Sequence, residues 1–181
     1  MRKHVYILLA IFSFTLISSN KEVKRVNQLT DTQSVIKALY IYTFATLIDW
    51  PANLRKGDFE IAVLGSKTAV FKELNDKYAG KSIGSQEIVI KNYTNQSEIN
   101  NAHILYITEE KSQYISSLAE QLKPKSTLIV SERPGGLSRG AIVNFIVEGN
   151  IQKYEINLKN AKRHSLVIAS KLANLAANRV E

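Results

Sequence analysis

The chain has 181 residues, of which 45% are hydrophobic and 22% charged, a composition typical of a globular protein and unlike that of a disordered or collagen-like chain. It contains no cysteine, which excludes a disulfide framework, a thiolate metal site and a cysteine nucleophile. The formal net charge of +8 comes from dispersed basic residues without the interleaved aromatic residues of a single-strand binder, so we expect no nucleic-acid partner.

The first twenty residues are typical of a signal peptide. Arg2 and Lys3 form a positive start, an apolar run follows over residues 5–17, and short polar residues occupy 18–20. At about 1.5 Å per residue, this run reaches only about 20 Å as a helix, short of the ~30 Å hydrocarbon core of a bilayer. The sequence therefore predicts an export signal over residues 1–20 rather than a retained anchor, and it leaves the cleavage point open.

The mature chain, residues 21–181, is predicted to be a single domain that begins with a helix over 35–50. Pro51 ends this helix, because proline disfavours helical geometry in the residue before it. Lys37 and Tyr40 belong to a narrow polar line on an otherwise apolar surface. A helix of this kind is buried on more than one side, either within its own domain or against another chain.

Strands then alternate with helices along the chain. The predicted strands cover residues 59–65, 86–90, 104–108 and 127–131, and the predicted helices cover 68–78, 98–102 and 112–122. Such alternation indicates right-handed crossovers and a largely parallel sheet with helices on both faces. We therefore predict the α/β class, as a three-layer sandwich around a mostly parallel central sheet.

The alternation ends after Pro134. Residues 141–147 and 152–158 are predicted to be strands, joined by a tight turn at Glu148-Gly149-Asn150. This antiparallel hairpin is expected to close the sheet. One long helix over 160–180 then follows, with an apolar face that covers the sheet or meets a partner helix.

The chemistry-bearing motifs give no convincing catalytic site. Residues 136–140 match G-x-S-x-G, but a nucleophile elbow leads from a strand into a helix, and here a β-type segment follows Ser138. His103 precedes a buried strand and is interpreted as a structural residue, and His164 is too isolated to indicate a metal site. We therefore predict a protein that is not an enzyme and binds no cofactor or metal; hydrolysis through Ser138 is the third alternative.

Several segments, taken together in order and spacing, resemble the YfiR family. They are residues 35–44, Asp49-Trp50-Pro51, and residues 61–65, 103–107, 128–132, 140–145, 154–158 and 170–172. The resemblance covers about residues 33–178, nearly the whole mature chain. Within this motif, Phe44, Trp50 and Pro51 are interpreted as the structural corner of the first helix.

This resemblance implies a function. The family consists of small exported bacterial proteins, and its best-known members are periplasmic repressors of a membrane-bound diguanylate cyclase in the cyclic di-GMP pathway. It implies an α/β sandwich, a homodimer and a periplasmic location, and relatives beside sensor histidine kinases leave a kinase open as the membrane partner. Well-known relatives carry cysteines tied to redox control, which this chain lacks, so any switch must act through a ligand, a partner or the state of the envelope.

We therefore expect a non-catalytic regulator that represses a membrane signalling protein by binding its periplasmic domain. The residues predicted to contact the partner are Phe145, Glu155, Asn157 and Leu158. The alternative is a periplasmic small-molecule-binding sensor module, with a sensor histidine kinase left open as the protein on which it acts. Its ligand would lie at the carboxyl ends of the parallel strands, near residues 65–67 and 108–109, where doubly wound sheets leave a crevice.

Overall fold

The computed structural model describes residues 32–66 and 68–181, within which Val35–Glu181 form one compact unit. The predicted signal peptide over residues 1–20 lies outside the described residues. Within the described ranges, no helix combines the length and apolar character needed to cross a bilayer.

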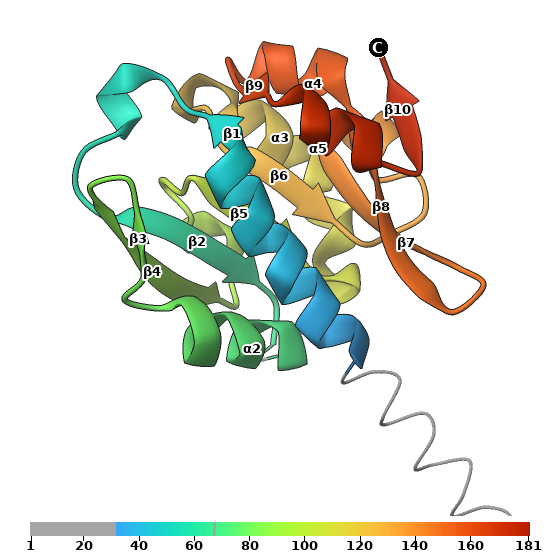
Figure 1. Ribbon diagram of the computed structural model, residues 1–181, viewed down its shortest axis with the longest axis horizontal. Coiled ribbons are helices and arrows are strands. Elements are labelled where there is room, and N and C mark those ends of the chain that lie inside the picture. Colours follow the sequence, from blue (N-terminus) through green and yellow to red (C-terminus); the bar gives the residue numbers. More distant parts are fainter. Residues whose placement is uncertain (1–31, 67) are drawn as a thin grey trace, which may run out of the picture. The chain divides into compact units, whose positions relative to one another are not determined.

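The centre of the unit is an eight-stranded sheet of order β10-β8-β7-β6-β5-β2-β4-β3 (Figure 1). Its strands are β2 (Phe59–Leu64), β3 (Ser82–Ile83), β4 (Gln86–Tyr93), β5 (Ile104–Ile107), β6 (Leu128–Ser131), β7 (Val143–Glu148), β8 (Ile151–Asn157) and β10 (Asn178–Val180). The strands from β4 through β2, β5 and β6 to β7 run parallel, which confirms the predicted alternation. Strands β5 and β6 are buried throughout, because a parallel sheet with helices on both faces is shielded from water on both sides.

Helices cover the two faces, so the structure has the three layers that the sequence predicts (Figure 1). On one face, the N-terminal helix, described over residues 32–47, and α2 (Ala69–Tyr78) pack against residues such as Ile61 and Val63. On the other face, α3 (Ile115–Leu122) packs against Ala62 and Leu64. Successive residues of β2 thus point into different cores, as the two-residue period of a strand requires.

Local signals account for two predicted boundaries. The Thr68 hydroxyl accepts a hydrogen bond from the Phe71 N–H at 3.2 Å and caps the start of α2. At the β7–β8 turn, Gly149 and Asn150 have φ values of 54° and 73°, which is the pair of left-handed residues that a type I′ turn requires.

Three shorter segments differ from their predictions. The N-terminal helix ends at residue 47, and Ile48–Asp49 form the short strand β1 instead of a last helical turn. The helix predicted over 98–102 is a single 3-10 turn, Gln96–Glu98. The helix predicted over 112–122 starts with a longer 3-10 segment, Glu109–Tyr114, before α3 begins.

The prediction of a single helix over residues 160–180 is wrong. That segment forms the end of α4 (Leu158–Arg163), then β9 (Val167–Ile168), α5 (Ser170–Leu175) and β10. Helix α4 stops where Ser165 takes a left-handed φ of 56°. Strand β9 then pairs with β1, and β10 pairs in parallel with β8, so backbone groups from distant parts of the chain replace the bonds of a continuous helix.

The hairpin of β7 and β8 forms as predicted, but it does not close the sheet, because β10 lies outside it. Strand β7 pairs with β6 only at Val143 and Asn144, whereas its pairing with β8 continues to Glu148. Residues 145–154 therefore extend beyond the last partner on β6, and the hairpin projects from the sheet in Figure 1.

His103 is a buried structural residue, in agreement with the sequence. The Glu60 N–H donates to His103 Nδ1 at 3.1 Å, and Nε2 lies 2.8 Å from the Leu54 carbonyl oxygen, so Nε2 carries the proton of the neutral ring. The ring also stacks on Phe59, with centroids 4.3 Å apart. Burial lowers the pKa of His103, and it lowers the pKa of the buried His164 in the same way.

We expect the melting temperature to fall as the pH decreases from about 7.5 to about 5.5. Below the usual histidine pKa of about 6.5 the unfolded chain binds protons that the folded protein does not, so stability is greatest above that pH and declines below it. Thermal unfolding followed by circular dichroism across this range checks the decline. In the variant His103→Gln, the melting temperature should fall less over this pH range. If it falls by the same amount as in the wild type, His103 does not contribute to the pH dependence.

Candidate functional site

The strand order places a topological switch between β2 and β5. After β2 the chain forms β4 on one side of it, and it then returns to form β5 on the other side. Ligands of doubly wound sheets bind at the carboxyl ends of the strands at such a point. The ligand position predicted from the sequence, near residues 65–67 and 108–109, therefore coincides with this switch point.

The protein's own side chains occupy that crevice. Gly65 has a φ of 147°, and a Cβ built on it would lie 2.3 Å from Thr108 Oγ1, which itself donates to the Leu64 carbonyl at 3.0 Å. The Glu110 carboxylate accepts the Ser66 N–H at 2.5 Å and the Ser66 hydroxyl at 3.0 Å. These bonds lower the pKa of Glu110. Glu110 thus already accepts the hydrogen bonds from Ser66 that a bound anion would otherwise accept.

Next along this edge, Glu132 ties the N-terminal helix to the sheet. Its carboxylate accepts from Lys37 Nζ at 2.5 Å, from the Tyr106 hydroxyl at 2.6 Å and from the Glu109 N–H at 3.0 Å. The side chains of Lys37 and Glu132 are only 16% and 18% exposed. Burial is the main cause that raises the pKa of Tyr106 well above its usual value, and the nearby Glu132 carboxylate adds to the effect. The phenol therefore stays protonated and donates to Glu132.

A second polar chain crosses β6, β7 and β8. The Ser131 hydroxyl donates to Asn144 Oδ1 at 2.6 Å, and Asn144 Nδ2 donates to Glu155 Oε1 at 2.9 Å. Gly136 passes so close that a Cβ there would lie 2.1 Å from Ser131 Oγ. The loop before β7 is thereby packed directly on this chain, which fixes the position of Glu155.

Glu132 and Glu155 converge on one open cleft of about 430 Å³ beside the projecting hairpin. We call it the acidic cleft; its lining residues are Glu132, Pro134, Gly135, Phe145, Ile146, Val147 and Glu155. Lys37 compensates the charge of Glu132, whereas Glu155 has no ion-pair partner within residues 32–66 and 68–181. The cleft therefore combines an uncompensated carboxylate with an apolar wall.

The structure brings two of the four predicted contact residues to this cleft. Glu155 is half-buried at its edge, and Phe145 lines it although its side chain is only 3% exposed. Asn157 caps α4, since its Oδ1 accepts the Asn160 N–H at 3.0 Å, and Leu158 packs against the main core. Partner binding by these residues stays a prediction.

The predicted corner of the first helix is a packed structural element. Phe44 is fully buried and meets the Tyr154 ring edge-on at 5.1 Å. Trp50 is 5% exposed and meets the Phe59 ring in the same way at 5.0 Å. Pro51 opens the 3-10 turn Ala52–Leu54, whose closing hydrogen bond runs from the Leu54 N–H to the Pro51 carbonyl at 2.9 Å.

Sequence reasoning placed the contact residues on the predicted hairpin but did not identify the two exposed apolar residues at its tip. Val147 and Ile151 are 50% and 62% exposed, although both are large hydrophobic residues. The available signal was length: the predicted strand over 141–147 is longer than the neighbouring strand over 127–131, so its far end had no partner on that side. This difference in strand length would have predicted that the tip of the hairpin projects beyond the sheet.

The G-x-S-x-G segment does not form a nucleophile elbow. Residues Leu137–Arg139 make a 3-10 turn, and strand β7 follows instead of a helix. The Ser138 hydroxyl donates to the Gly135 carbonyl at 2.8 Å. The serine therefore stabilises a loop.

A family model described as YfiR/HmsC-like matches residues 34–177. No curated protein matches the sequence significantly. The crystal structure of a conserved domain protein from Vibrio cholerae O1 biovar El Tor strain N16961 has a TM-score of 0.55 at 11% identity, over 78% of this chain and 59% of that one. The ABC domain in complex with L-Trp from Streptococcus pneumoniae has a TM-score of 0.49 at 10% identity, over 67% and 55%. The chain thus spans less than two thirds of either structure, and the first likeness supports the α/β fold alone.

Proposed function

The chain belongs to the YfiR/HmsC-like family, and from that premise we propose that it is an exported, non-catalytic regulator in cyclic di-GMP signalling. In this proposal it binds the periplasmic domain of a membrane-bound diguanylate cyclase and stabilises the inactive state of the cyclase. Such repression requires only that the regulator bind the inactive conformation more tightly than the active one. Homodimerisation, which the family resemblance implies, stays a prediction.

The main support for binding to a partner protein is the projecting hairpin with the acidic cleft beside it. Val147 and Ile151 expose apolar surface on opposite faces of the hairpin tip, since Ile151 pairs with Glu148, and exposed apolar surface of this kind often marks protein interfaces. A partner that covers both side chains would therefore have to enclose the tip. Glu155 adds an uncompensated carboxylate at the edge of that surface. The matching partner surface would combine apolar side chains with a Lys or Arg, because complementary charge guides association and orientation.

The first test is capture of the membrane partner. The tagged mature protein, residues 21–181, is incubated with detergent-solubilised membranes of its host, and the retained proteins are identified by mass spectrometry. We expect a diguanylate cyclase among them. A sensor histidine kinase in its place would assign the regulator to a kinase, and recovery of no membrane protein above an untagged control would contradict the proposal.

The variant Glu155→Lys is expected to weaken binding to the cyclase periplasmic domain by about tenfold or more, since it places a cation where the partner's cation would lie. The variant Glu155→Gln is the matched control for folding, because its amide oxygen can still accept from Asn144 Nδ2. Glu87→Lys makes the same charge change at an exposed position on β4 and should bind normally. Titration calorimetry measures all three, and equal weakening by the variants at Glu87 and Glu155 would indicate a general charge effect.

The small-molecule alternative is less well supported at the site the sequence predicts. Thr108 and Glu110 occupy the crevice between β2 and β5, and Glu110 takes the donors of Ser66. A ligand there would have to displace a carboxylate from two hydrogen bonds. The geometry therefore favours protein binding at the hairpin over ligand binding in the crevice.

A further inference from the structure

A second cavity lies away from the acidic cleft, at the corner where the N-terminal helix meets β1 and the β3–β4 turn. Its volume is about 270 Å³. The residues that line it are Ala45, Thr46, Ile48, Asp49, Trp50, Arg55, Phe59, Ile83, Gly84, Ser85 and Gln86. We call it the Trp50 cavity. Gly84 leaves open space here, since a Cβ on it would meet no atom within 4 Å.

Trp50 forms a wall of this cavity and holds an unused donor. The side chain is 5% exposed, and its indole N–H is buried without a hydrogen-bond partner in the part of the chain that the structure describes. An unpaired buried donor is costly, because it has lost its water and gained nothing in return. An acceptor that reaches this N–H from the cavity side would recover that loss.

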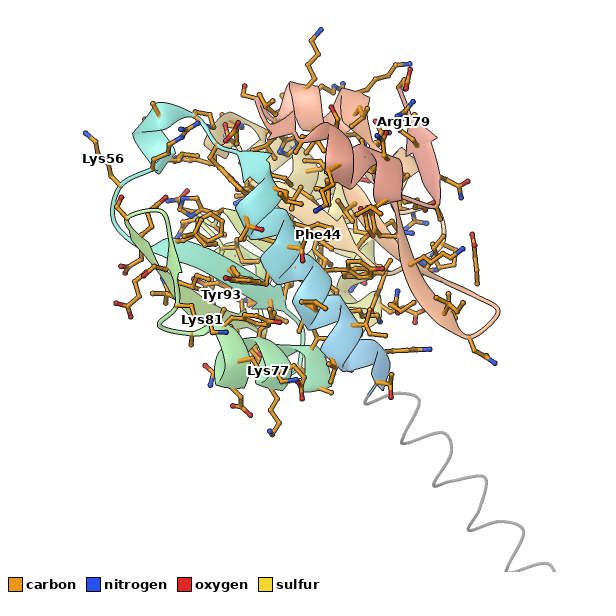
Figure 2. The ribbon with its side chains drawn as sticks, in the orientation of Figure 1. Phe44, Lys56, Lys77, Lys81, Tyr93 and Arg179 are labelled. Atoms are coloured by element: carbon orange, nitrogen blue, oxygen red, sulfur yellow. The ribbon has the colours of Figure 1, made fainter. Side chains whose placement is uncertain are left out.

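Arg55 supplies positive charge at the same cavity. Its Nε donates to the main-chain carbonyl of Trp50 at 2.9 Å, and both residues line the cavity. Arg55 forms an ion pair with Asp49, whose Oδ1 lies 3.8 Å from Arg55 Nη2, and the side chains of Asp49 and Arg55 are 74% and 59% exposed. An exposed pair at that distance contributes little, so the guanidinium remains available to a second anion. The neighbouring Lys56 points outward into solvent (Figure 2).

We propose that the Trp50 cavity binds a small carboxylate with a short apolar body. The carboxylate pairs with Arg55, and the apolar body packs on Ala45, Ile48 and Ile83. A cavity lined by both a guanidinium and a residue with an unpaired N–H favours a charged acceptor over a neutral one, because charge-assisted hydrogen bonds are the stronger kind. The volume lies just below the range of drug-sized sites, which restricts the ligand to a small molecule. This site is independent of the proposed regulatory partner.

The test uses Trp50 as its own probe, since it is the only tryptophan in the sequence. Phenylacetate and hexanoate are titrated into the mature protein while tryptophan emission and the melting temperature are recorded. We expect a saturable change in emission and, at about one hundred times the Kd, a rise of about 5 °C or more in melting temperature. Phenethylamine, of similar shape and opposite charge, should produce neither effect.

Three variants locate the binding. Arg55→Gln should weaken phenylacetate binding by about tenfold or more, and Thr46→Phe should block the cavity from an exposed helical position. Asp49→Asn should tighten binding several-fold, because it removes both repulsion and competition for the guanidinium. Arg139→Gln, in the loop before β7, makes the same change elsewhere and should have no effect.

Any of three results would overturn the proposal. The first is the absence of saturable binding of both carboxylates below about 10 mM. The second is binding that survives both Arg55→Gln and Thr46→Phe, since the ligand would then lie elsewhere. The third is weaker binding in Asp49→Asn, which would identify a cation site. If Arg55→Gln does not fold, the other two variants still decide between these results.

Discussion

The variant Phe145→Ala is expected to lower the free energy of unfolding by about 3–5 kcal/mol, the usual range for deleting a buried aromatic ring. Phe145 is 3% exposed, and its ring centroid lies 6.2 Å from that of Tyr40 and 6.1 Å from those of Phe44 and Tyr106. The ring thus joins β7 to the N-terminal helix and to β5. Urea denaturation followed by circular dichroism measures the change.

Val147→Ala is the control for this variant, because Val147 follows on the same face of β7 but is half exposed, and surface substitutions usually change stability by less than about 0.5 kcal/mol. The comparison decides what Phe145 does. If Phe145→Ala keeps its stability to within about 1 kcal/mol and loses only partner binding, Phe145 is a contact residue, as the sequence led us to expect. A large loss of stability assigns the residue to the core.

The double variant Val147→Asp, Ile151→Asp is expected to fold normally and to weaken binding to the proposed partner, the periplasmic domain of a diguanylate cyclase, by about a hundredfold or more. Both side chains are at least half exposed on the hairpin, so the free protein tolerates a carboxylate at either position. In the complex they would be buried, where central apolar residues contribute about 2 kcal/mol or more each. Calorimetric titration measures the affinity, and cyclic di-GMP should rise in cells that carry the variant.

Val167→Asp is the matched control for the tip, since Val167 is 64% exposed but lies on β9, away from the hairpin. It should bind the cyclase domain as the wild type does. Loss of binding in Val167→Asp together with normal binding in the double variant would move the interface to the surface of β9 and α5, where Leu175 is also exposed. The thermal melt of each variant separates lost binding from lost folding.

The alternating part of the fold was predictable because its signals are local. Residues 59–64 and 104–107 form nearly continuous apolar runs, as strands buried on both faces do, and Thr68 marks the start of α2. The turn at Gly149 and Asn150 is equally local, because the backbone geometry of a two-residue turn depends on those residues. These elements occur where the sequence places them, to within a few residues.

The C-terminal segment was not predictable in the same way. Its apolar residues fit a helical period, yet Ile168 pairs with Ile48, and Arg179 pairs with Ile156. Strands β1 and β9 form a separate two-stranded sheet, and β10 joins the main sheet at β8, so both pairings need a partner strand from a distant part of the chain to be in place first. A helix over 160–180 satisfies its own backbone locally, and the structure replaces it because hydrogen bonds from β1 and β8 are available there.

The candidate site also combines features that the sequence predicts with features that only the tertiary structure decides. The sequence by itself determined the α/β class, the parallel direction of the central strands, the structural role of His103 and the family to which the chain belongs, since these follow from periodicity, turn residues and matching segments. Only the tertiary structure decided that Phe145 is buried while Val147, two residues later, is exposed. The physical reason is that pairing on β6 stops at Asn144, so burial along β7 depends on where its neighbours end.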